Sequence, residues 1–94
     1  MKVKFELGQT VQTRGIAAAC EDNEAFTKEI YEAFNKFVLC NWGDTCPEDC
    51  ALNDSAVKNN DDRIVAKYET SKGNIFIITE WDRSATTILF ANEY

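Results

Sequence analysis

From Arg63 to the C-terminus, apolar residues fall into three short runs separated by two polar breaks. Alternate residues of each run are apolar, which is the pattern of a β-strand that buries one face. These residues are Ile64, Ala66 and Tyr68 in the first run, Phe76 and Ile78 in the second, and Ile88 and Phe90 in the third. Residues 71–74 supply the first turn, because Gly73 tolerates a positive φ. The pattern predicts a three-stranded antiparallel meander.

The central run, Ile75–Ile78, is apolar on both of its faces. One face can meet the helices, and the other needs a cover. The Trp81 ring, the N-terminal segment and a second copy of the chain are the candidates, so a homodimer is one arrangement that the sequence favours.

Near the N-terminus the apolar residues again alternate with charged ones, which predicts a further strand of the sheet. These residues are Val3, Phe5 and Leu7. After them, Thr10 and Val11 either extend the strand or begin another. Thr13 can cap a short helical turn that runs into residues 17–19.

A long helix is expected in the middle of the chain, beginning after a cap at Asp22 or Asn23 and ending near Cys40 or Asn41. Its apolar residues recur at helical spacing, so one side should lie against the sheet. These residues are Phe26, Ile30, Phe34, Phe37 and Val38.

A second, shorter helix is predicted from Cys46 to Lys58. Thr45 and Glu48 have the spacing of a capping box, and Pro47 falls in the first turn, where its missing N–H does no harm. The chain of 94 residues is long enough for one hydrophobic core. We therefore expect a single α+β domain over residues 1–94, with a small antiparallel sheet of the N-terminal strand and the meander packed on two helices.

Sixteen acidic residues against ten basic ones give a formal charge of −6, which disfavours direct binding to nucleic acid. An acidic surface can instead occupy the basic groove of a nucleic-acid enzyme, so an inhibitor of a defence nuclease is an alternative function. The N-terminal residues lack the apolar core of a signal peptide, and no apolar run approaches the roughly 20 residues that span a bilayer. A cytoplasmic protein without a membrane span is expected.

The chain contains no histidine, which excludes Ser-His and Cys-His nucleophilic pairs within it. It also lacks the glycine-rich motifs that bind phosphates and dinucleotides. These observations favour a protein that is not an enzyme and has no cofactor. An enzyme that uses carboxylates and Arg83 remains a second alternative.

The four cysteines are the one set with metal-binding chemistry: Cys20, Cys40, Cys46 and Cys50. Four thiols can hold one tetrahedral zinc, but the two-residue spacing of a zinc knuckle is missing. Disulfides are disfavoured in a reducing compartment. We expect reduced, partly buried thiols and no metal site.

The second polar break of the meander, residues 80–84, places an aromatic and three charges in one corner. Side chains there either close the turn by hydrogen bonds or form a recognition surface. The candidate partner-binding residues are Trp81, Asp82, Arg83 and Ser84 of this corner, together with Trp42 and Arg14.

Several segments of the chain resemble a family of small proteins carried on plasmids, phages and integrated mobile elements of Gram-positive gut bacteria. They are residues 8–11, 13–16 and 42–44, Asn53, and most specifically residues 77–94. The family has no established activity, so the resemblance implies no catalytic or binding residue. The leading hypothesis from the sequence is a non-enzymatic accessory or interaction protein of a mobile element that binds a protein of the host or of the element. Where the family tends to have acidic and small polar residues, this chain has Cys46 and Cys50, which argues against a metal site shared by the family.

Overall fold

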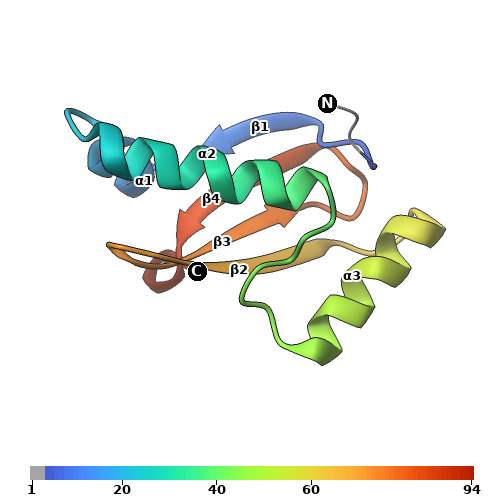
Figure 1. Ribbon diagram of the computed structural model, residues 1–94. Coiled ribbons are helices and arrows are strands. Elements are labelled where there is room, and N and C mark those ends of the chain that lie inside the picture. Colours follow the sequence, from blue (N-terminus) through green and yellow to red (C-terminus); the bar gives the residue numbers. More distant parts are fainter. Residues whose placement is uncertain (1–3) are drawn as a thin grey trace.

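The predicted meander forms three of the four strands of a mixed sheet in the computed structural model, which describes residues 4–94 (Figure 1). In chain order the elements are β1 (Gln9–Gln12), α1 (Arg14–Cys20), α2 (Glu24–Val38), α3 (Pro47–Asn59), β2 (Ile64–Thr70), β3 (Gly73–Thr79), β4 (Ala85–Phe90) and the 3₁₀-helix η1 (Ala91–Glu93). The α+β class expected from the sequence is confirmed.

The strand order across the sheet is β1-β4-β3-β2. The pairs β2–β3 and β3–β4 are antiparallel, as the meander requires. The expectation of a fully antiparallel sheet was wrong, because β1 pairs with β4 in parallel, with Gln9 opposite Ala85 and Gln12 opposite Ile88. Three helices and two strands intervene between β1 and β4, so the direction of this pair depends on a long return of the chain that local patterns do not encode.

The strand predicted from Val3 to Leu7 was placed too early in the chain. Val3 lies outside the described residues, and Phe5 lies in a bend with its ring buried edge-on against Phe37, at 5.5 Å between centroids. The strand begins only after Gly8, which has a φ of +64°. A side chain at that position would meet the backbone of Arg83 and Ser84 at 2.4 Å. The apolar residues of this N-terminal segment therefore do not mark a strand of the sheet. Phe5 instead anchors the segment to the core.

The caps predicted for the first two helices are present. The Thr13 side chain accepts a hydrogen bond from the Ile16 N–H, and the Asn23 side chain accepts one from the Phe26 N–H. Thr13 caps a complete helix, α1, so the structure has three helices where two were expected. Among the helices of residues 4–94, none is long and apolar enough to cross a bilayer.

The start of α3 differs from the predicted capping box. Cys46 is the N-cap and makes no side-chain capping bond, while Pro47 occupies the first turn as expected. The Thr45 hydroxyl instead bonds the Trp42 carbonyl and the Lys67 N–H. A tertiary contact with β2 has replaced the local cap.

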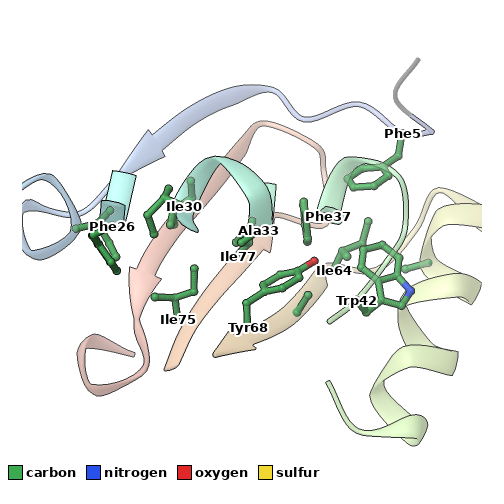
Figure 2. Close-up of a cluster of buried hydrophobic side chains, with 14 residues drawn as sticks. Phe5, Phe26, Ile30, Ala33, Phe37, Trp42, Ile64, Tyr68, Ile75 and Ile77 are labelled. Carbon is green, nitrogen blue, oxygen red and sulfur yellow. The ribbon is translucent and has the colours of Figure 1, made fainter. Parts of the chain in front are cut away.

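The core lies between α2 and one face of the sheet, as Figure 2 shows. The α2 side chains of Phe26, Ile30, Ala33 and Phe37 point toward sheet residues that include Ile75 and Ile77. Burying each large apolar side chain contributes about 1.5–3 kcal/mol. Asp49, Leu52 and Asn53 of α3 line a hollow together with Val65, Phe76 and Tyr94 on the other face of the sheet.

The face opposite α2 is also partly closed by the C-terminus. The Tyr94 ring lies 5.3 Å from the Phe76 ring, and Ile78 and Leu89 are each less than a tenth exposed. Trp81 is 66% exposed, and the Phe5 ring packs into the core on the opposite side of the sheet. The sequence suggested the Trp81 ring or the N-terminal segment as a cover for this face. The Trp81 ring does not cover it, and the Phe5 ring of the N-terminal segment lies in the core on the other side of the sheet.

Candidate functional site at a free sheet edge

One edge of the sheet, strand β2, is closed by side chains from α3. The Asn53 amide donates to the Val65 carbonyl at 2.9 Å, and the Val65 N–H donates to the Asn53 Oδ1 at 3.1 Å. Asn53 is 3% exposed, so this pair of bonds is made away from water. The side chain stands in for the backbone of a neighbouring strand.

The loop before α3 closes the rest of this edge. The Lys67 N–H donates to the Thr45 Oγ1 at 2.8 Å, and the Lys67 carbonyl accepts from the Asp44 N–H at 2.9 Å. The Glu69 N–H donates to the Asp44 carboxylate at 2.9 Å. Val65, Lys67 and Glu69 are the alternate residues that face outward, and each has a partner. Edges closed in this way resist unplanned strand pairing.

Among residues 4–94, no side chain closes the opposite edge, strand β1, in this way. The Gln9 N–H donates to the Ser84 carbonyl, and the Thr13 N–H donates to the Ile88 carbonyl, so the odd-numbered residues face β4. Because backbone groups alternate in direction along a strand, Thr10 and Gln12 direct their N–H and C=O groups outward. All four residues of β1 are exposed, and within the sheet of residues 4–94 the strand has β4 as its single neighbour.

An apolar groove of about 270 Å³ runs beside this free edge, between β1 and α2. Thr10 and Gln12 form one wall, and α2 forms the other. The α2 residues of the lining are Thr27, Ile30, Tyr31 and Phe34. Cys20 of α1 and Ile88 of β4 complete it. Tyr31 is 66% exposed at the rim, whereas Ile30 and Ile88 are buried and form the apolar part of the lining.

A second, wider hollow joins the groove at the corner between α1 and α2. The two hollows share Cys20, Thr27 and Tyr31, so they are contiguous. The second hollow adds carboxylates from Asp22, Glu24 and Glu32 and one ammonium group from Lys28. The apolar groove therefore lies beside a negatively charged surface along α2.

The predicted partner-binding corner proves to be mainly a structural turn. The Asp82 carboxylate accepts a hydrogen bond from the Ser84 N–H at 3.0 Å, and the bonds from Ser84 lower the pKa of Asp82. Trp81 alone presents a large exposed side chain there. Closure of a turn by an Asp side chain is common chemistry for this residue type.

Arg83, the centre of that corner in the sequence, points into the protein and is 6% exposed. Its guanidinium donates to the carbonyls of Ala56 at 2.9 Å and Asp62 at 2.7 Å. It also donates to the carbonyls of Glu80 and Trp81, both at 3.2 Å. Arg83 thus ties the end of α3 and the following loop to the β3–β4 turn, which is a structural role.

Trp42 and Arg14 lie apart from the corner. Trp42 is 5% exposed, packs against Phe37 and donates from Nε1 to the Asp54 carboxylate at 2.8 Å. Arg14 is exposed and begins α1, at the opposite end of β1 from the corner. The six predicted residues therefore do not gather on one surface, although Arg14 follows Gln12 closely and lies beside the free edge.

The four cysteines are free thiols. Cys20 borders the groove, and the Cys50 thiol donates to the Thr45 carbonyl at 3.4 Å. Burial raises the pKa of the Cys40 thiol, which keeps it protonated at neutral pH. Over residues 4–94, no cluster of three or more Cys, Asp or Glu side chains has an arrangement that could hold a metal ion.

Sequence reasoning missed Thr10, Gln12 and Tyr31 as site residues. One signal was present: in the segment from Gln9 to Gln12 polar residues occupy both faces, which is typical of an exposed edge strand. Tyr31 interrupts the polar face of α2 but lies outside its apolar stripe. Only the position of β1 beside α2 brings these three residues together.

No family model, curated protein or solved structure matches this chain. The case for a function therefore rests on the geometry of the molecule.

Proposed function

We propose that this protein is a non-enzymatic interaction module that binds an extended segment of a partner protein by strand addition at the free edge of β1. One observation supports the proposal above the others. The β2 edge is closed at each outward-facing residue by Asn53, Thr45 and Asp44. The β1 edge, by contrast, is left open by the residues that the structure describes, and it lies beside an apolar groove. An open edge next to pockets for alternate side chains is the arrangement that strand addition uses.

The backbone of β1 supplies the affinity in this mode of binding. Thr10 and Gln12 each offer one N–H and one C=O to an added strand. Each new hydrogen bond contributes about 1 kcal/mol. Alternate side chains of the bound segment then point toward the α2 side, where the groove receives them, and specificity arises there.

The occupant is a segment of another protein and not a second copy of this chain. A symmetric pairing of two β1 edges would bring together two acidic molecules, each with a formal charge of −6 and with carboxylates beside the groove. Like charges across an interface oppose association. A partner of different sequence avoids this repulsion.

The proposal includes the biological context that the family resemblance suggests. The partner is a protein of the host or of a mobile element that carries the gene. Neither alternative function gains a supporting observation. The sixteen acidic residues are spread over the helices, the loops and the strands and do not gather on one element. The α1–α2 corner and α3, which both carry acidic residues, lie at opposite ends of the molecule in Figure 1. The guanidinium of Arg83, required by the enzyme alternative, is bonded to four backbone carbonyls.

A substitution at Thr10 tests the proposal. Proline at this position removes an outward N–H and places a ring at the edge, while an edge strand tolerates proline where its N–H faces solvent. The matched control is Thr10→Val, which keeps the N–H and the shape of the side chain. The probe is a displayed library of random short peptides, selected on the full chain.

The expected result is a set of peptides that bind the wild-type protein and the Thr10→Val variant but not the Thr10→Pro variant. Circular dichroism and thermal unfolding establish that both variants keep the fold. Selected peptides that bind the proline variant as tightly as the wild type would overturn the proposal, as would a library that yields no peptide dependent on this edge.

A further inference from the structure

We infer that the segment bound at the β1 edge carries a large apolar side chain that enters the groove and, close to it, a lysine or arginine that reaches the acidic hollow at the α1–α2 corner. This inference rests on the proposed function, because it names the chemistry of the segment that strand addition would take. It also assigns a role to Tyr31, which both hollows share.

The apolar part follows from the lining of the groove. Ile30 and Ile88 are each 6% exposed and Phe34 is half-buried, so an inserted side chain meets hydrocarbon on two sides. Thr10 and Gln12 lie on the wall that carries the free backbone groups. A side chain projecting from an added strand on this face enters the groove directly, because side chains stand roughly perpendicular to a sheet.

The basic part follows from the charges of the hollow beside the groove. Asp22, Glu24 and Glu32 contribute three carboxylates against the single ammonium group of Lys28. The hollow runs beside the groove along α2 and shares Cys20, Thr27 and Tyr31 with it, so one segment can reach both. An acidic segment would meet repulsion here and from the negative charge of the whole molecule.

The charge of Glu32 provides the test. Glu32 is exposed in the middle of α2, so Glu32→Lys reverses one charge of the hollow without disturbing the core. Glu69→Lys is the control, since it makes the same change in net charge at an exposed position of β2, on the far edge of the sheet. Both variants and the wild type are titrated with peptides selected from the random library, at low and at high salt.

We expect the selected peptides to combine an apolar residue with a nearby lysine or arginine. Glu32→Lys should weaken their binding about fivefold, as loss of one exposed ion pair and gain of a repulsion imply, and high salt should reduce the difference. Glu69→Lys should leave binding within about twofold of the wild type.

Two outcomes separate this inference from the proposal beneath it. Peptides that need the β1 edge, by the Thr10→Pro test, but are neutral or acidic and bind the Glu32→Lys variant normally would overturn the inference and leave strand addition standing. Failure to select any peptide that needs the edge would overturn both.

Discussion

Asn53 forms both hydrogen bonds of its side-chain amide with the backbone of one residue, Val65, at 2.9 and 3.1 Å. A helix residue thereby completes the edge of a sheet. The opposite edge at β1 lacks this completion, and the difference between the two edges is the basis of the function proposed here.

Loss of the Asn53 amide should open the β2 edge. We expect Asn53→Ala to lower the free energy of unfolding by about 2 kcal/mol, because the Val65 N–H and C=O would be left unpaired in a buried place. It should also promote self-association, because an uncovered edge pairs with other chains. Urea unfolding and analytical ultracentrifugation measure the two effects. Asn59→Ala, at an exposed position of the same helix, should produce neither.

Removal of the Arg83 guanidinium should destabilise the β3–β4 corner, residues 80–84, for which the sequence predicts a binding surface. We expect Arg83→Met to lower the free energy of unfolding by about 3 kcal/mol, since carbonyls of three segments lose a charged donor. Arg63→Met is the control, because Arg63 is exposed and lies over the Tyr94 ring at 6.0 Å. Thermal unfolding of both variants gives the comparison. Equal melting temperatures would contradict the structural role of Arg83.

Two exposed aromatic residues distinguish the groove from the corner. Tyr31 borders the groove and Trp81 lies in the β3–β4 corner, and each is 66% exposed. Tyr31→Ala should weaken binding of a selected peptide about tenfold, as loss of an aromatic anchor does at an interface. Trp81→Ala should leave binding unchanged, and both variants should keep their stability to within about 0.5 kcal/mol. If Trp81→Ala weakened binding and Tyr31→Ala did not, the binding site would lie at the β3–β4 corner and not at the groove.

Methylation of the bound peptide should reveal the alternation of a strand. We expect N-methyl groups at every second residue of a selected peptide to abolish binding, since those residues donate to the carbonyls of Thr10 and Gln12. N-methyl groups at the residues between them should be tolerated, because their N–H groups face away from β1. Isothermal titration of singly methylated peptides measures this. A uniform loss at all positions would exclude pairing with one strand edge.

Acid should weaken the contact between α2 and the β2–β3 turn. The Glu29 carboxylate accepts hydrogen bonds from the Ser71 N–H and hydroxyl, which lower its pKa from the ordinary value of 4.5. Because the pKa is lower in the folded state, this contribution to stability is present above the unfolded pKa and is lost as the pH falls through the folded pKa.

Glu29→Gln should therefore be less stable than the wild type at neutral pH, and the difference should shrink on acidification below about pH 4.5. Urea unfolding at a series of pH values measures it. Ser71→Ala is the matched partner: its removal of one hydrogen bond should reduce the same pH dependence. A difference that is constant with pH would show that Glu29 acts other than through its charge.

Much of the local structure was predictable because its causes are local. The apolar spacing from Phe26 to Val38 and the cap at Asn23 lie within one helix, and the alternation in β2, β3 and β4 lies within each strand. A prediction from local spacing was wrong where a contact with a distant segment used the same side chain. Thr45 had the spacing of a cap but bonds Lys67 across 22 residues.

The candidate site was not predictable to the same degree. Trp81, Arg83 and Trp42 have the residue types of a binding surface, yet one is exposed and two are buried. The local sequence Asp82, Arg83, Ser84 does not determine whether the arginine is exposed or buried. The carbonyls that Arg83 bonds come from residues up to 27 positions away. Residue type limits the chemistry of a side chain but not its direction.

The amino-acid sequence by itself determined the α+β class, the meander, the long amphipathic helix and the absence of histidine chemistry, since each follows from composition or from a repeat along a few residues. Only the tertiary structure decided that β1 runs parallel to β4, that α3 closes one edge of the sheet and that the other edge stays open beside α2. The physical reason is that these features depend on which distant segments pair their backbone hydrogen-bonding groups and bury each other's apolar surface. Sequences with the same local pattern can do this with different neighbouring segments.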